Sequence, residues 1–125
     1  MAKKVLVIED EDDYVSLLLH ILEKHGYDVE VARSGEEGVA AFQRKKPDLV
    51  LLDLNLPDMD GFEVCRRLKK DSEARQVPIL FCTIRSAVAP VSEGLKAGGY
   101  DYIVKPFEIS DLISRVQNAL RKGDS

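Results

Sequence analysis

Short apolar runs divide the chain, and longer amphipathic stretches lie between them. Four of these runs cover residues 5–8, 49–52, 79–82 and 102–104. They are too short for typical helices and too apolar for loops, which is typical of strands buried on both faces of a parallel sheet. A further run, residues 28–31, alternates polar and apolar side chains and is expected at an edge of the same sheet.

The stretches between the runs carry apolar side chains at helical spacing and begin at cap residues. We expect Asp12 or Asp13 to cap the first helix, which should end near Gly26. Capping pairs predict the next two helices, and these pairs are Ser34 with Glu37 and Asp60 with Glu63. The last helix has the best amphipathic pattern, formed by Ile109, Leu112, Ile113, Val116 and Leu120.

Residues 86–99 predict a weaker helix, because Pro90, Gly94 and the glycine pair 98–99 all lower helix stability. Residues 122–125 are expected to be a polar tail, either the end of a stand-alone protein or the start of a linker. Strands that alternate with helices in this way predict an α/β fold. We therefore expect one domain over residues 1–125, with a doubly wound five-stranded parallel sheet, right-handed crossovers and helices on both faces.

Composition narrows the function classes. The chain has 125 residues, of which 45% are hydrophobic and 32% charged, as in one globular domain. Its net charge of −4 argues against direct binding of nucleic acid. No apolar run approaches the roughly 20 residues of a membrane helix, and no signal-peptide pattern opens the chain. Cys65 and Cys82 lie in apolar contexts without metal spacing, so we expect buried thiols in the reducing cytoplasm.

Polar side chains stand where the buried runs end. They are Glu9 and Asp10, Asp53, Thr83 and Lys105. The carboxyl ends of parallel strands share one edge of the sheet, and ligands bind outside that edge. Each residue alone is explained as easily by a helix cap, a polar strand end or a solvated charge as by a functional role. Together on one edge they favour a functional site.

Clustered carboxylates repel one another, and Lys105 supplies only one positive charge. A site with oxygen ligands and few protein groups suits Mg²⁺, which keeps several waters. A carboxylate beside Mg²⁺, a lysine and a hydroxyl is equipped to accept a phosphoryl group, with Asp53 as the nucleophile. Lys105 and Thr83 would neutralise or hydrogen-bond the phosphoryl oxygens.

These residues resemble the receiver domains of bacterial two-component response regulators. The resemblance covers residues 4–121 and rests on Val-Ile-Glu9-Asp10, Leu-Leu-Asp53-Leu-Asn-Leu-Pro-Asp-Met-Asp-Gly61, Thr83 and Asp-Tyr102-Ile-Val-Lys105-Pro106-Phe. It implies a flavodoxin-like sheet with strand order 2-1-3-4-5 and a cis bond between Lys105 and Pro106. It also implies that Asp53 accepts a phosphoryl group from a sensor histidine kinase or phosphotransfer protein. Such a domain assists its own phosphotransfer and dephosphorylation without being an enzyme.

The resemblance also implies a metal site and a switch. The implied Mg²⁺ ligands are Glu9, Asp10, Asp53 and the backbone carbonyl of Asn55. In the implied switch, Thr83 moves toward the phosphoryl group while the Tyr102 ring turns inward. The output surface is expected on the fourth helix, last strand and fifth helix, where a phosphorylation-dependent homodimer could form. Candidate pairing residues there are Lys96, Asp101, Asp111 and Arg115.

Two departures from the family pattern lie near the switch. Ile84 stands where a small residue is usual, and Gly99-Tyr100 stands where a small residue and an acid are more usual. A pseudo-receiver that binds proteins without taking phosphate is therefore the alternative. A phosphatase with an aspartyl-phosphate intermediate is disfavoured, because such enzymes usually carry a second Asp where this chain has Asn55.

Overall fold

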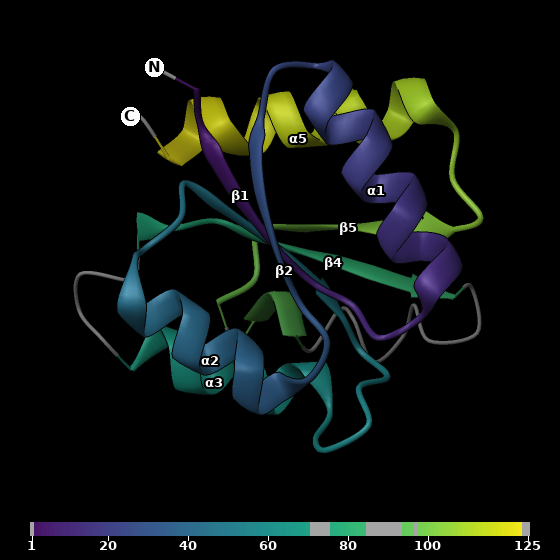
Figure 1. Ribbon diagram of the computed structural model, residues 1–125. Coiled ribbons are helices and arrows are strands. Elements are labelled where there is room, and N and C mark those ends of the chain that lie inside the picture. Colours follow the sequence, from purple (N-terminus) through teal and green to yellow (C-terminus); the bar gives the residue numbers. More distant parts are fainter. Residues whose placement is uncertain (1, 71–75, 85–93, 97, 124–125) are drawn as a thin grey trace.

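The computed structural model of the protein has a five-stranded parallel sheet with helices on both faces (Figure 1). It describes residues 2–70, 76–84, 94–96 and 98–123. The strands are β1 (Lys4–Ile8), β2 (Asp28–Ala32), β3 (Leu49–Asp53), β4 (Ile79–Ile84) and β5 (Asp101–Lys105). The helices are α1 (Asp12–Lys24), α2 (Gly35–Arg44), α3 (Gly61–Lys69) and α5 (Ile109–Gly123).

The strand order is β2-β1-β3-β4-β5, which confirms the order implied by the family resemblance. All neighbouring strands in this sheet are parallel, so their carboxyl ends lie at one edge. The register pairs Asp53 with Cys82 and Ile84 with Lys105. This register brings the ends of β3, β4 and β5 together, as the sequence predicted. The edge position expected for residues 28–31 is also confirmed.

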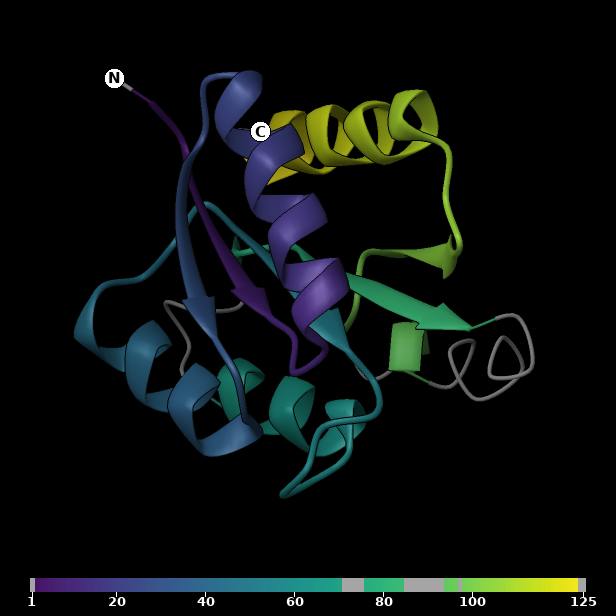
Figure 2. The same ribbon diagram turned by 45° about the vertical axis from the view of Figure 1, so that its right-hand side comes forward.

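Two apolar cores lie on opposite faces of the sheet. Both ribbon views show α1 and α5 covering one face and α2 and α3 covering the other (Figures 1 and 2). Leu51 belongs to the core beneath α1 and α5, and its neighbour Leu52 belongs to the core beneath α2 and α3. Since side chains alternate along a strand, Asp53 falls on the α1 and α5 face at the end of β3.

The predicted caps are largely confirmed. The Ser34 hydroxyl accepts a hydrogen bond from the Glu37 amide at 3.1 Å, and Asp60 accepts one from the Glu63 amide at 2.9 Å. Gly26 follows α1 with a φ of 87°, a left-handed conformation that glycine adopts without a steric cost. The cap predicted for α1 was wrong.

Glu11 occupies the N-cap of α1 without a side-chain cap bond, and Asp12 and Asp13 fall inside the first turn. They are favourable there because carboxylates interact well with the positive end of a helix dipole. Ile109, the first residue of the amphipathic pattern of the last helix, is 52% exposed. Helix α5 also continues through Gly123, into the segment expected as a polar tail.

The helix predicted over residues 86–99 falls mostly outside the described residues, including Pro90. Of that segment, residues 94–96 are helical. No helix in the described ranges is long and apolar enough to cross a membrane.

Candidate functional site

A cavity of about 300 Å³ opens at the carboxyl edge of the sheet. Its lining comes from the ends of β1, β3, β4 and β5 and from the start of α1. The lining residues are Glu9, Asp10, Glu11, Tyr14, Asp53, Asn55, Ile84 and Lys105. The structure therefore brings together most of the predicted site residues, from positions that are far apart along the chain.

Lys105 lies among buried acids. It is 7% exposed, and its ammonium nitrogen lies 2.5 Å from Oε1 of Glu9 and 3.7 Å from Oδ1 of Asp53. The second oxygen of Glu9 accepts hydrogen bonds from the amides of Asp10 and Glu11, at 3.0 and 3.2 Å. Both carboxylate oxygens of Glu9 are thus engaged, and one of them holds Lys105.

Asp53 is 8% exposed and accepts a hydrogen bond from the Asn55 amide at 3.3 Å. Burial, with the nearby Glu9 carboxylate adding to its effect, raises the pKa of Asp53 from 3.8 to about 6 against the opposing charge of Lys105. For Lys105, burial lowers the pKa, but the hydrogen bond to Glu9 and the charges of Asp53 and Glu9 outweigh it, so the pKa is raised. The Lys105 ammonium thus lies near two buried carboxylates, and it compensates the charge of Asp53 less well than that of Glu9 because Asp53 is farther away.

The donor set fits Mg²⁺. This ion is usually held by one or two carboxylates with several waters. Asp10 is exposed at the cavity, Asp53 borders it, and Asn55 follows two residues later. Among the described residues, no group of three or more His, Cys, Asp or Glu side chains is arranged around a metal position. The engagement of Glu9 with Lys105 agrees with that observation and leaves Asp10 and Asp53 as the carboxylates with available oxygens.

The loop between β3 and α3 is anchored at several points. The Gly61 amide donates to the Leu54 carbonyl at 3.0 Å, and a Cβ at Gly61 would lie 2.7 Å from the Asp53 carbonyl oxygen. Asp58 accepts hydrogen bonds from the amides of Gly35 and Glu36, at 2.8 and 2.9 Å, at the start of α2. These contacts fix the segment that carries the Asn55 carbonyl beside Asp53.

Thr83 and Tyr102 lie on the other face of the sheet. Thr83 follows Cys82, the partner of Asp53, so pleating directs its side chain away from the Asp53 face. It is buried, and its hydroxyl donates to the Ile84 carbonyl at 3.4 Å. Tyr102 packs against the core beneath α2 and α3, with its ring centroid 5.8 Å from the guanidinium of Arg115. Neither residue lines the cavity in this structure.

Two apolar side chains do line the cavity. Ile84 is 48% exposed and is paired in register with Lys105, so a larger side chain than the small one usual at this position borders the cavity. Tyr14 shares the helical spacing of the apolar face of α1. Its ring centroid lies 4.2 Å from the Lys105 ammonium nitrogen. Helical periodicity alone gave no signal for this contact.

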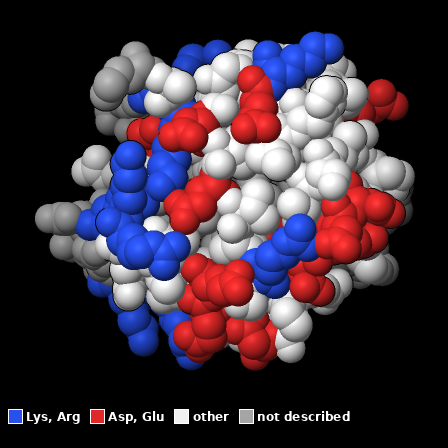
Figure 3. Space-filling model, in the orientation of Figure 1, with Lys and Arg blue, Asp and Glu red and all other residues white. Residues whose placement is uncertain are grey.

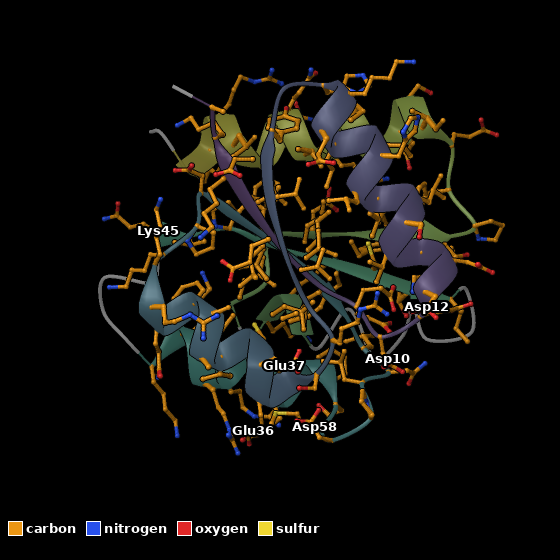
Figure 4. All side chains as sticks on the ribbon, viewed as in Figure 1. Asp10, Asp12, Glu36, Glu37, Lys45 and Asp58 are labelled. Atoms are coloured by element: carbon orange, nitrogen blue, oxygen red, sulfur yellow. The ribbon has the colours of Figure 1, made fainter. Side chains whose placement is uncertain are left out.

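Acidic side chains gather around the site on the surface (Figure 3). Figure 4 places Asp10 and Asp12 near the start of α1, and Glu36, Glu37 and Asp58 around the start of α2. Such a rim attracts cations and repels anions.

The thiol of Cys82 lies buried on β4. Burial raises its pKa to about 12, so the thiol stays protonated and is no nucleophile.

Comparisons with known proteins agree with one another. A family model described as the response regulator receiver domain matches residues 5–117. The alkaline phosphatase synthesis transcriptional regulatory protein PhoP of Bacillus subtilis is 40% identical over 124 residues, which are 99% of this chain and 51% of that protein. The chain spans about half the length of the curated relatives it matches.

Two solved structures share the whole fold. Chemotaxis protein CheY4 of Vibrio cholerae is 31% identical with a TM-score of 0.89, covering 95% of this chain and 99% of that one. The receiver domain of a sensor histidine kinase from Pseudomonas aeruginosa is 27% identical with a TM-score of 0.89, covering 97% of this chain and 99% of that one. That neighbour has a magnesium ion coordinated in its active site cleft.

Proposed function

Because this chain belongs to the response regulator receiver domain family, we propose that it is a signalling switch that accepts a phosphoryl group on Asp53. The observation that carries the proposal is the setting of Asp53. It ends the central strand, borders an open cavity and has the Lys105 ammonium 3.7 Å away. A buried carboxylate with one shared cation gains from any further positive charge at the site.

In the proposed reaction, an ionised oxygen of Asp53 forms a bond to phosphorus. The bond between phosphorus and the leaving atom of the donor breaks, and the donor group departs with that electron pair. Because the Lys105 ammonium lies 3.7 Å from Oδ1 of Asp53, it would meet an oxygen of the transferred group. Such neutralisation of the phosphoryl oxygens supplies most of the catalysis in phosphoryl transfer. The chain therefore assists its own phosphotransfer as a signalling domain.

We propose Mg²⁺ as the cofactor, held by Asp10, Asp53 and the Asn55 carbonyl. When bound, the ion would neutralise charge on Asp53 and on the phosphoryl group. Glu9 joins this set in the family pattern. Its two engaged oxygens favour a role in which it holds Lys105 and meets the ion only through water.

The proposed switch involves Thr83 and Tyr102, which lie on the same face of neighbouring strands. Movement of the Thr83 hydroxyl toward the phosphoryl group would free space for the Tyr102 ring. The surface around Tyr102 also carries Arg115, whose guanidinium contacts Asp101 at 2.9 Å and Asp111 at 3.1 Å within the chain. A homodimer through this face would exchange these pairs for equivalent pairs with the other copy.

We propose a sensor histidine kinase or phosphotransfer protein as the donor, met in the cytoplasm. Direct binding of nucleic acid is not proposed for this domain, since its net charge is −4. PhoP is a transcriptional regulatory protein about twice as long as the matched region. An effect on transcription would therefore depend on an output region outside the receiver domain.

Acetyl phosphate with Mg²⁺, followed by intact-mass measurement, tests the proposal. The parent should gain one phosphoryl group, and Asp53→Asn should gain none. A parent that stays unmodified with both reagents would favour the pseudo-receiver alternative. A variant that is modified at the parent's rate would move the acceptor to another residue.

A further inference from the structure

Tyr14 belongs to the cavity although the family pattern gives it no role. It lies in the first turn of α1, and its ring centroid is 4.2 Å from the ammonium nitrogen of Lys105. The ring also contacts Phe107, with centroids 6.1 Å apart. Phe107 follows Lys105 and Pro106, so α1 and the end of β5 meet through this aromatic pair.

Among the described residues, two carboxylates and one aromatic ring contact the Lys105 ammonium. The carboxylates are those of Glu9 and Asp53, at 2.5 and 3.7 Å, and the ring is that of Tyr14. Cation–π attraction is strongest where the cation is removed from water, and Lys105 is buried. The carboxylates carry charge and compete with a phosphoryl group for the ammonium. The ring is neutral and stabilises the ammonium without that competition.

We propose that Tyr14 is a positioning residue that holds the Lys105 ammonium inside the site, where it can reach a phosphoryl group on Asp53. This inference rests on the proposed function. Glu9 already makes the shortest of these contacts, at 2.5 Å, and loss of the ring would let it draw Lys105 further from the position where the phosphoryl oxygens arrive. Tyr14 thereby sets how tightly the site holds the phosphoryl group.

The first test needs no phosphoryl group. In the metal-free protein, the ring current of Tyr14 should shift the ε-methylene protons of Lys105 upfield in the NMR spectrum. Tyr14→Phe should keep that shift, because it keeps the ring. Tyr14→Leu and Tyr14→Met should lose it. An unchanged Lys105 signal in a folded Leu or Met variant would overturn the proposed contact.

The second test measures the affinity for beryllofluoride, a mimic of the bound phosphoryl group, in the presence of Mg²⁺. Tyr14→Leu and Tyr14→Met should bind it about 3- to 30-fold more weakly than the parent, the range expected for one cation–π contact. Tyr14→Phe should bind within about twofold of the parent. Tyr27→Leu removes a half-buried tyrosine between α1 and β2 and controls for general loss of packing.

The outcomes distinguish failure of the proposed function from failure of the proposed role of Tyr14. Failure of the parent itself to bind beryllofluoride would refute the proposed function, while the NMR test would still decide the contact. Normal binding by folded Tyr14→Leu and Tyr14→Met proteins would refute the positioning role. Loss of affinity in Tyr14→Phe would refute it too, since the hydroxyl and not the ring would then be responsible. Equal losses in Tyr27→Leu and Tyr14→Leu would assign the effect to packing.

Discussion

Replacement of Asp53 by asparagine should stabilise the metal-free protein at neutral and alkaline pH. The pKa of the Asp53 carboxyl is raised from 3.8 to about 6 by burial, with Glu9 adding to the effect. Because its folded pKa lies above its unfolded value, the carboxyl contributes stability that is complete below 3.8 and lost as the pH rises through about 6. Asparagine has nearly the same shape and does not ionise.

The size of the effect follows from the two pKa values. A tenfold change in acidity corresponds to about 1.4 kcal/mol, so the full difference approaches roughly 3 kcal/mol at about pH 8. The same linkage reduces it to roughly 1 kcal/mol at about pH 4.5. The metal-free Asn variant should therefore gain its advantage over the parent between these two pH values. Bound Mg²⁺ should remove much of the advantage by compensating the charge of Asp53.

Urea unfolding followed by circular dichroism, in the presence of EDTA, measures this directly. Asp28→Asn is the matched control, because Asp28 is an exposed carboxylate at the start of the edge strand β2. Its stability relative to the parent should change little with pH. A constant difference between Asp53→Asn and the parent across the pH range would refute the reasoning. So would a parent that is the more stable protein at about pH 8.

Three further substitutions test other parts of the site. Lys105→Ala should lose most phosphotransfer and destabilise the fold by about 3 kcal/mol, because it leaves Glu9 buried without its cation. Phosphorylation rates measure the first effect and urea unfolding measures the second. An unchanged unfolding midpoint would contradict the pairing of Lys105 with Glu9. Asp10→Asn should weaken Mg²⁺ binding in calorimetric titration without destabilising the metal-free protein, and an affinity equal to the parent's would exclude Asp10 as a ligand. Ile84→Ala should load and lose the phosphoryl group faster than the parent, since a stiff β-branched side chain borders the cavity; equal half-lives would remove the steric argument.

The sequence predicted the sheet and its polar edge because both depend on local pattern. Residues 49–52 are apolar and are followed at once by Asp53 and a series of turn residues, so strand β3 could be placed to its last residue. The capping pairs of α2 and α3 likewise use contacts three residues apart. Such features need no knowledge of how the chain packs.

Other features depend on tertiary contacts that local pattern does not contain. The pair of Glu9 and Lys105 joins opposite ends of the chain, and the sequence did not reveal that it would occupy an oxygen expected for the metal. The position of Thr83 behind the Asp53 face depends on strand register. Tyr14 follows the same helical spacing as core residues such as Leu18, so only the fold distinguishes its contact with Lys105.

Identification of the modified residue tests the central claim most directly. The protein is incubated with acetyl phosphate and Mg²⁺, treated with borohydride to reduce an acyl phosphate to an alcohol, digested and sequenced by mass spectrometry. We predict homoserine at position 53 in the parent, dependent on both acetyl phosphate and Mg²⁺. Homoserine at another aspartate, or none at any position under conditions in which a known receiver domain is labelled, would contradict the assignment of Asp53 as the phosphoacceptor.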